Sequence, residues 1–579
     1  MRKTDKEQII RKHALQNAIQ YGGTAKASSV MGKVLAECPD LKSNAKELMQ
    51  TVVKITEEVN SLSLIRQEET LKENWPDAKV EEPKTEEKKL PPLPNIEKYT
   101  SVHVRFSPNP DGALHLGGAR AAILCDEYAK MYNGMFTLRF DDSDPRTKSP
   151  IPEAYEWIKK DLEWLGVTLH NTVYQSDRLE IYYGYTKQLL EMGVAYVCTC
   201  KSAEFRKLVL AHTACPCRNL SSRDHLARWT MMLEGRFDEG EAVVRVKTDL
   251  NHPNPAVREW PALRVIDTGK FPHPRTGSKY RVWPLFAFCC GIDDHDLQIT
   301  HIIRGKEHLT NTTRQIFLYN YLQWVYPEAI HYGRLKIVGT MLSKSKVREG
   351  IVKGIYKGWD DPRLGTLIAL RKRGFLPETV RQLILDVGPK PVDATISWDN
   401  FQALNRKLLD PVADRYFFVA TPLRLDVKNV KRAYIVKIPL HPSNPDKGTR
   451  NFQVEPKNGL VSILFSKDDL RILEPEKTVR LMGLFNITLK RVDDQIEAIY
   501  HSETYAEAKR ADAPLIHWIP SDTGVVTSVV MPDASSVKGL AEDRCRELKP
   551  DDIVQFERFG FIRVDIAVGD SITAYYAHR

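Results

Sequence analysis

The stretch SPNPDGALHLGGAR at residues 107–120 decides the fold, because it joins a predicted strand to a predicted helix. Apolar and polar residues alternate over residues 102–106, which predicts a half-buried β-strand. A helix is expected from about Leu116 to Tyr132, with Gly134 as its C-terminal cap, and Met135 to Phe140 reads as the next strand. This order predicts a βαβ unit, and therefore a parallel sheet with helical crossovers.

The loop before the predicted helix has the features of a phosphate site. A helix N-terminus offers unpaired N–H groups and a partial positive charge. Gly117 and Gly118 would let a nucleotide approach the backbone, and His115 can donate a hydrogen bond to a phosphate oxygen. Taken alone, the segment fits a glycine-containing turn with a surface histidine better, because short Gly-rich patterns are common.

A second element changes this interpretation. Residues 341–345 read MLSKS and lie about 225 residues after His115, in a loop between Gly339 and Lys346. Lys344 could place a point charge on a leaving pyrophosphate. Loops of serine and lysine are usually only solvated, but the order of the two elements is informative.

Together these segments resemble the class I aminoacyl-tRNA synthetases. Residues 108–120 resemble their HIGH signature region, and residues 341–345 resemble their KMSKS loop. Residues 138–145 and 358–363 resemble segments of the glutamyl/glutaminyl subgroup, and the whole is similar to glutamyl-tRNA synthetases of the archaeal type. The resemblance runs from about residue 98 to the C-terminus, and several motifs in the same order make it specific.

The resemblance implies a two-step ligation of L-glutamate to tRNA(Glu). The glutamate α-carboxylate attacks the α-phosphate of ATP, and a ribose hydroxyl of the terminal adenosine of the tRNA then attacks the adenylate. ATP, Mg²⁺ and bound tRNA are expected for the first step, and whether tRNA(Gln) is also charged stays open. The alternatives are a glutaminyl-tRNA synthetase and a non-catalytic tRNA-binding protein on the same scaffold. Positioning and charge stabilisation should dominate such chemistry.

By the same resemblance, His115 and Lys344 are the catalytic residues, which stabilise the phosphates and the departing pyrophosphate respectively. Two positions depart from the motifs. Gly118 replaces the second histidine of HIGH, and Met341 replaces the first lysine of KMSKS, which puts more weight on Lys344. The expected ATP-binding residues are Asn109, Leu116, Gly117, Gly118, Ser343 and the pair that would frame the adenine ring, Arg334 and Leu335.

The amino-acid pocket follows from the resemblance too. Asp141 matches the residue that holds the α-ammonium group, and Arg105 matches an arginine found in both specificities. Arg304 stands where glutamate enzymes carry arginine, and a guanidinium can form two charge-assisted hydrogen bonds with a carboxylate. Phe286 and Ala287 depart from the usual tyrosine and Asn or Asp, so this pocket loses a hydroxyl donor. A turn-capping aspartate and a surface arginine are the ordinary alternatives for Asp141 and Arg304.

Four cysteines form a candidate metal site. Cys198 and Cys200 make one C-x-C pair, and Cys215 and Cys217 make another, with 14 residues between the pairs. Four thiolates suit tetrahedral Zn²⁺. Some related enzymes carry zinc here, in the insert that contacts the tRNA acceptor stem. One residue separates the two cysteines of each pair, whereas the commoner zinc knuckle has two. Four reduced cysteines without a metal therefore remain the alternative.

The predicted fold is a multidomain α/β protein, with a Rossmann-like class I synthetase catalytic domain, an inserted acceptor-binding domain, a helical N-terminal extension and C-terminal β-barrels. The expected domains are the helical extension 1–75, a Pro/charged linker 76–97, the first catalytic half 98–197, the acceptor-stem-binding insert 198–280, the second catalytic half 281–345, a helical connection 346–410 and two anticodon-binding β-barrels 411–579.

Composition sets outer limits on the 579-residue chain. With 42% hydrophobic and 27% charged residues, it is neither wholly disordered nor collagen-like. The 84 basic and 75 acidic residues give a net charge of +9, which permits an RNA partner without demanding one. Nine cysteines are too few for a disulfide scaffold, and neither a secretory signal nor an 18-residue apolar run is found. We expect a cytoplasmic monomer without membrane contact.

Overall fold

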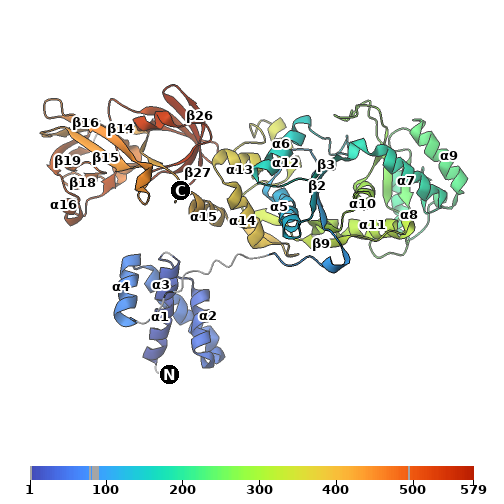
Figure 1. The fold of residues 1–579 in the computed structure, drawn as a ribbon, viewed down its shortest axis with the longest axis horizontal. Helices are drawn as coiled ribbons and strands as arrows, with labels where there is room; N and C mark the ends of the chain where they lie inside the picture. The colour runs from blue at the N-terminus through green and yellow to red at the C-terminus, as the bar shows by residue number, and fades with distance from the viewer. Residues whose placement is uncertain (1–2, 22, 77, 79, 81–89, 493–495) are drawn as a thin grey trace. The chain divides into compact units, whose positions relative to one another are not determined.

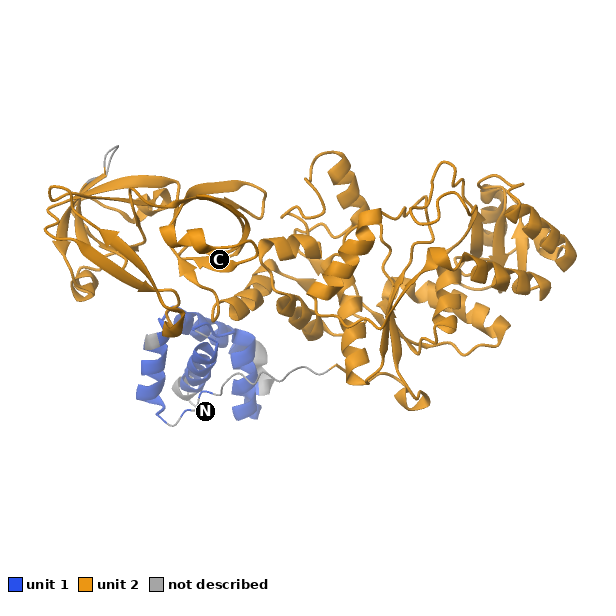
Figure 2. Cartoon of the chain, turned by 45° about the horizontal axis from the view of Figure 1, so that its top comes forward, with its two compact units in different colours: residues 1–89 blue, residues 90–579 orange. Residues whose placement is uncertain are grey.

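The computed structural model describes residues 3–21, 23–76, 78, 80, 90–492 and 496–579. The chain divides into two compact units, residues 1–89 and 90–579 (Figure 2). The first unit contains helices α1 (Lys3–Gln20), α2 (Ala27–Glu37), α3 (Ala45–Asn60) and α4 (Leu64–Asn74) (Figure 1). Apolar residues at helical spacing, such as Val52, Ile55 and Val59, form its core. The helices predicted in this region are therefore present.

The predicted linker, residues 76–97, lies partly outside the described residues, which leave out 77, 79 and 81–89. At its end, Leu90 and Leu93 are buried in the core of the second unit. The backbone N–H of Leu93 donates a hydrogen bond to the hydroxyl of Tyr132 (3.0 Å). The chain is thus fixed to the second unit before its first strand.

A parallel sheet forms the centre of the second unit, and its strand order is β3-β2-β1-β8-β9. The strands are β1 (His103–Phe106), β2 (Met135–Phe140), β3 (Asn171–Tyr174), β8 (His301–Gly305) and β9 (Glu328–Tyr332). Helix α5 (Leu116–Met131) crosses from β1 to β2 (Figure 1). Its residues 119–126 are all buried, so this part of the helix is covered on every side and not only by the sheet. The predicted βαβ unit is confirmed, with the helix start and the β2 bounds as expected.

In the sequence, a separate antiparallel sheet is inserted between β3 and β8 of the parallel sheet. Its strand order is β4-β5-β6-β7. Its strands are β4 (Ala195–Cys198), β5 (Val243–Val246), β6 (Pro261–Val265) and β7 (Val282–Pro284), covered by α7 (Leu179–Glu191) and α9 (Ser222–Leu233). Helix α10 (Phe286–Asp296) then leads the chain back to β8. No helix in the described ranges is long and apolar enough to cross a membrane.

Helices follow β9, and two larger sheets end the chain. The helices are α12 (Lys344–Val352), α13 (Leu367–Arg373), α14 (Pro377–Val387) and α15 (Trp398–Leu409). One sheet contains β12 (Arg415–Tyr416), β13 (Phe418–Ala420), β23 (Val525–Val530), β24 (Ser536–Ala541), β25 (Ile553–Phe556), β26 (Gly560–Val568) and β27 (Ser571–His578). The other contains β14 (Pro422–Lys428), β17 (Val461–Ser466), β18 (Thr478–Leu481), β19 (Asn486–Val492), β20 (Ile496–Ser502), β21 (Leu515–Ile516) and β22 (Ile519–Pro520).

These two sheets are interleaved in the chain. Strands β12 and β13 pair with β25 and β24, although more than a hundred residues separate them in the sequence. The other sheet is built entirely from the segment between β13 and β23. Within that sheet, β18 and β19 form an antiparallel pair, and the chain turns between them at Gly483 with φ +72°.

One buried carboxyl group links the catalytic region to the helices after it. Asp161 on α6 (Pro152–Trp164) is fully buried, and neither of its oxygens accepts a hydrogen bond from a described residue. Its only ion-pair partner among the described residues is Arg371 of α13, at 3.9 Å. Burial raises the pKa of Asp161 to about 7.

We expect Asp161→Asn to stabilise the protein at pH 8 and to have much less effect at pH 5. Because the folded-state pKa lies above the ordinary value of 3.8, the folded state gains stability from the protonated acid and loses it as the pH rises toward 7. The difference is on the order of 3 kcal/mol. Thermal unfolding at both pH values measures it, with Asp386→Asn as control, because Asp386 is an exposed residue of α14. An equal stability change at both pH values would contradict the argument.

Candidate active site

Lys344 joins the two signature loops. It is the first residue of α12, and its ammonium group donates hydrogen bonds to the carbonyl oxygen of Asn109 (2.7 Å) and to Oδ1 of Asp111 (3.0 Å). Burial lowers the pKa of Lys344, and the Asp111 carboxylate opposes this. A cavity of about 340 Å³ opens beside this contact and is also lined by Lys148 and Arg348. The structure therefore brings together segments that are more than 200 residues apart.

His115 is the N-terminal capping residue of α5, the helix that connects β1 to β2. Its Nδ1 accepts a hydrogen bond from the backbone N–H of Gly118 (3.2 Å), at the start of α5. Burial, followed by the charge of Lys344, lowers the pKa of His115 to about 4, so the ring is neutral at pH 7. Because Nδ1 accepts, the proton resides on Nε2, which has no hydrogen-bond partner among the described residues. The site thus holds a free N–H donor beside a helix N-terminus.

The segment 358–363 and the residues just after it pack against the first signature loop, residues 108–120. The ring of Trp359 lies against Gly112, where a Cβ atom would stand only 2.2 Å from the ring. The backbone N–H of Leu116 donates to the carbonyl of Gly365 (3.1 Å), and Thr366 donates its hydroxyl proton to the carbonyl of Trp359 (2.6 Å). A glycine is required at position 112 for this packing, and the helices after β9 are thereby joined to the first signature loop.

Arg105 and Asp141 lie in one buried network at the ends of β1 and β2. Arg105 pairs with both oxygens of Asp294 on α10 (2.9 and 3.1 Å). Arg139 of β2 donates to Asp294 (2.8 Å) and to Asp141 (3.1 Å). Burial raises the pKa of Asp141 to about 6, against the opposing charges of Arg139 and Arg105. Arg105 and Arg139 therefore share one buried network with Asp141 and Asp294.

Arg304 lies on β8, and its side chain is buried. Its Nη1 has no hydrogen-bond partner among the described residues. Its other nitrogens donate to the side chains of Thr312, Gln315, Tyr326 and His331. Phe286 stacks on His308, with 4.7 Å between ring centroids, and burial, with Arg304 as the next cause, lowers the pKa of His308 to about 3. The predicted pocket residues Arg304 and Phe286 thus border the same buried region.

The remaining predicted ATP residues are placed differently. Arg334 is exposed, and its backbone N–H donates to Asp393 (2.8 Å). Leu335, the first residue of β10 (Leu335–Ile337), is buried in the core. Among the residues the structure describes, the side chain of Arg334 forms no hydrogen bond or ion pair with either signature loop. Ser343 precedes α12 and shares a hydrogen bond with Ser345 (3.1 Å). The expected contact with adenine stays a prediction.

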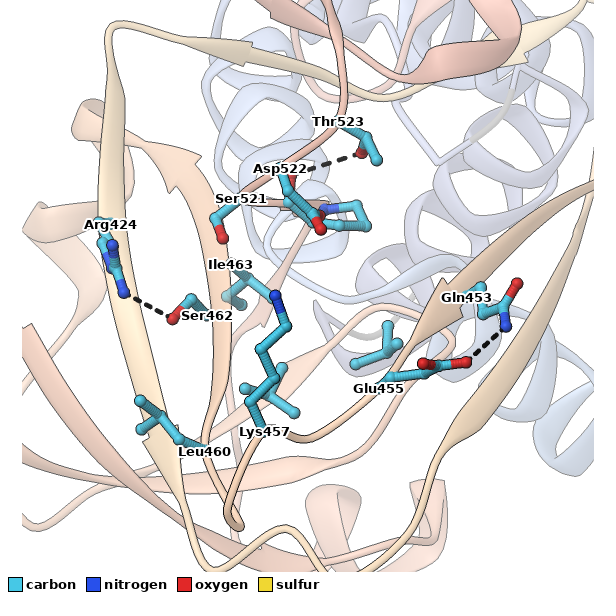
Figure 3. Close-up of a pocket in the computed structure, with 13 residues that line it drawn as sticks. Arg424, Gln453, Glu455, Lys457, Leu460, Ser462, Ile463, Ser521, Asp522 and Thr523 are labelled. Atoms are coloured by element: carbon cyan, nitrogen blue, oxygen red, sulfur yellow. Dashed lines mark hydrogen bonds between the residues drawn. The ribbon is translucent and has the colours of Figure 1, made fainter.

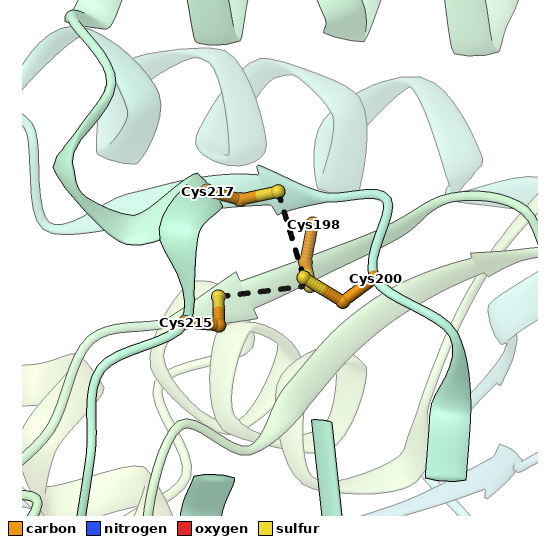
Figure 4. A group of neighbouring side chains, drawn as sticks. All are labelled: Cys198, Cys200, Cys215 and Cys217. Atoms are coloured by element: carbon orange, nitrogen blue, oxygen red, sulfur yellow. Dashed lines mark hydrogen bonds between the residues drawn. The ribbon is translucent and has the colours of Figure 1, made fainter. Parts of the chain in front are cut away.

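Four cysteine sulfurs gather beside β4 (Figure 4), and all lie within 4.8 Å of one another. The Sγ atoms of Cys198 and Cys215 are 3.9 Å apart, and those of Cys200 and Cys217 are 3.8 Å apart. With Zn–S bonds of about 2.3 Å, a tetrahedral site has sulfur–sulfur edges of about 3.8 Å. Arg228 also donates a hydrogen bond to the sulfur of Cys217 (3.3 Å), which favours a thiolate. The donor set therefore fits zinc.

A further cavity, of about 590 Å³, lies in the C-terminal region (Figure 3). Arg424 of β14 donates to the hydroxyl of Ser462 (2.9 Å), and Gln453 donates to Glu455 (2.7 Å) at its wall. Lys457 and Asp522 also line it. The lining combines these polar and charged side chains with apolar ones such as Leu460 and Ile463, and no residue assigned from the sequence lies there.

Comparison with known proteins decides the family. The family model described as tRNA synthetases class I (E and Q), catalytic domain, matches residues 101–411. This chain belongs to that family. Models of the anti-codon binding domain of the same E and Q synthetases match residues 413–505 and 515–565. The last two regions contain most of the interleaved C-terminal strands, so the family assignment covers nearly all of the second unit.

Relatives of this E and Q synthetase match it end to end. It is 53% identical to the glutamate–tRNA ligase of Pyrococcus abyssi, over 99% of this chain and 100% of the relative. It is 52% identical to that of Pyrococcus furiosus over the same shares. A crystal structure of a glutamate tRNA ligase from Elizabethkingia meningosepticum covers 54% of this chain and 70% of its own, with 22% identity and a TM-score of 0.40.

Sequence reasoning missed several residues of this synthetase's buried networks. Arg139, Asp293 and Asp294 were not assigned, yet they hold Arg105 and Asp141 in place. A signal was present, because residues 286–296 read FAFCCGIDDHD and place two adjacent acids directly after an apolar run of the same helix. Buried acids need cationic partners, so such a pair points to buried arginines nearby.

Proposed function

We propose that this synthetase ligates L-glutamate to tRNA through a glutamyl-adenylate, with ATP and Mg²⁺. Enzymes of this family use ATP and Mg²⁺, and the full-length relatives are glutamate–tRNA ligases. The observation that carries the choice of glutamate is Arg304. Its side chain is buried, and one of its terminal nitrogens has no partner, so it can receive a carboxylate.

The first step needs groups that hold phosphate and accept developing charge. An oxygen of the glutamate α-carboxylate attacks the α-phosphorus of ATP, and the bond to the β-phosphate oxygen breaks, so the electron pair leaves with pyrophosphate. The N-terminus of α5 and the Nε2–H of His115 can bind phosphate oxygens. Lys344 can stabilise the charge on pyrophosphate from the opposite loop. Mg²⁺ would bring further positive charge to the phosphates.

The glutamate would be held at both ends. Asp141, with a pKa of about 6, is ionised at pH 7 and can hold the α-ammonium group. Arg304 would bind the side-chain carboxylate, and Phe286 would close the pocket by packing against His308. Arg105 would act from its ion pair with Asp294. In the second step the ribose hydroxyl of the terminal adenosine attacks the adenylate carbonyl carbon, and AMP leaves.

Charging of each purified tRNA with radiolabelled glutamate and ATP tests the proposal. We expect transfer to tRNA(Glu), and we propose that tRNA(Gln) is also an acceptor and that the enzyme acts as a monomer. The same assay is run in parallel with radiolabelled glutamine in place of glutamate. Absence of glutamate transfer to any tRNA would exclude the ligase activity, whereas transfer of glutamine alone would exclude the specificity.

We also propose that Cys198, Cys200, Cys215 and Cys217 hold one Zn²⁺ that stabilises the region around β4. We expect about one zinc per purified chain by mass spectrometry. Cys217→Ser should lose most of this zinc and raise the KM for tRNA, because the metal ties two separate segments together. Cys38→Ser is the matched control, since Cys38 lies outside the cluster. Wild-type protein without zinc after growth in zinc-supplemented medium would disprove the site.

A further inference from the structure

The hydrogen-bond partners of Arg304 are all electrically neutral. Its Nη2 donates to the hydroxyls of Thr312 (2.5 Å) and Tyr326 (3.0 Å), and its Nε donates to His331 (3.4 Å). Burial and the charge of Arg304 lower the pKa of His331 to about 4, so this ring is neutral at pH 7. These hydrogen bonds thus fix the orientation of the guanidinium group, and none of them is formed with a negatively charged group that would neutralise it.

The acid that could have neutralised Arg304 is engaged elsewhere. Asp294 lies in the same buried region and acts on the pKa of Arg304. However, Arg105 takes both of its oxygens, and Arg139 shares one of them. Arg304 forms no ion pair with any described acid. The positive charge of Arg304 is therefore available to an anionic ligand. Because burying a charge without a counter-charge costs free energy, such a ligand would also relieve that cost.

Gln315 completes this neutral environment and has a fixed orientation. It lies fully buried on α11 (Leu309–Leu322). Its Oε1 accepts from Arg304 Nη2 (3.1 Å) and from the Tyr326 hydroxyl (2.8 Å), and its Nε2 donates to the carbonyl oxygen of Ala287 (3.2 Å). An ionised carboxyl group could satisfy Arg304 and Tyr326 but would face the Ala287 carbonyl with a second oxygen. The site thus requires an amide.

We infer that Gln315 is a positioning residue that determines specificity for an anionic amino-acid side chain. It holds the Arg304 guanidinium through a neutral oxygen and so leaves the full positive charge for the substrate carboxylate. A glutamate at position 315 would occupy nearly the same volume but would pair with Arg304 and cancel that charge. This inference rests on the proposed function, because it assumes that Arg304 receives the substrate carboxylate.

The test compares Gln315→Glu with Gln315→Met in the full-length enzyme. The KM for glutamate and the inhibition constant of glutamine as a competitor are measured in charging of tRNA(Glu). Gln315→Glu should raise the KM for glutamate about 100-fold while changing the glutamine constant less than tenfold. Gln315→Met keeps the charge on Arg304 but removes the three hydrogen bonds that Gln315 forms with Arg304, Tyr326 and the Ala287 carbonyl, so it should weaken both amino acids by a similar, smaller factor.

Two readouts separate specificity from damage to the fold. The KM for ATP should change less than threefold in both variants, because Gln315 does not contact the signature loops. If Gln315→Glu weakens glutamate and glutamine by the same factor, the inference is overturned, as it is if glutamate binding is unchanged. A wild-type enzyme that fails to charge glutamate would instead refute the proposed function, so the two failures are distinguishable.

Discussion

Replacement of Lys344 by methionine is expected to lower kcat/KM for glutamylation of tRNA by about 10²–10³-fold, the usual cost of removing one fixed group that stabilises developing charge. Lys344 is well placed for this role, because its ammonium group already contacts the first signature loop at Asn109 and Asp111. Met341 leaves the second loop without the cation that the motif has at its first position, so the loss should not be compensated from there.

The matched control for this prediction is Lys346→Met, which removes an exposed lysine from the same helix. ATP–pyrophosphate exchange with tRNA present isolates the first step, and transfer of preformed adenylate to tRNA isolates the second. We expect Lys344→Met to impair exchange strongly and transfer weakly. Equal activity of Lys344→Met and Lys346→Met in exchange would remove Lys344 from the mechanism.

Local signals allowed much of the catalytic fold to be predicted. Strand alternation before residue 107 and the glycine after the helix indicated β1, α5 and β2 nearly as they are, because these features depend on neighbours in the sequence. The pairing of the C-terminal strands could not be obtained in this way. Strands such as β12 and β13 find partners more than a hundred residues away, and no local pattern encodes that choice.

In the candidate site, too, some features could be predicted from the sequence and others could not. Motif order indicated that His115 and Lys344 belong to one site, and the structure brings their loops into contact. The partners of each charged group could not be foreseen. Asp294 could pair with Arg105, Arg139 or Arg304, and only the positions of α10 and β8 decide that it takes the first two. That arrangement leaves Arg304 without an acidic partner among the described residues, and the proposed choice of substrate rests on this property.

The strongest consequence concerns Arg304 itself. Arg304→Met keeps much of the side-chain volume and removes the charge. We expect it to reduce kcat/KM for glutamate by about 10²–10³-fold, since a buried carboxylate without a partner costs about 3–5 kcal/mol. Glutamine, which carries no charge at that end, should lose much less. Competition between the two amino acids in charging of tRNA(Glu) measures the change in preference.

Arg314→Met on the same helix as Gln315 is the control, because Arg314 donates to the backbone carbonyl of Ala256 and takes no part in the pocket. If Arg304→Met weakens both amino acids equally, Arg304 serves the fold of the pocket rather than the choice of substrate. If glutamate use is unchanged, the carboxylate is bound elsewhere, and Arg105 becomes the alternative. That outcome would require Asp294 to release Arg105, because both oxygens of Asp294 hold it in this structure.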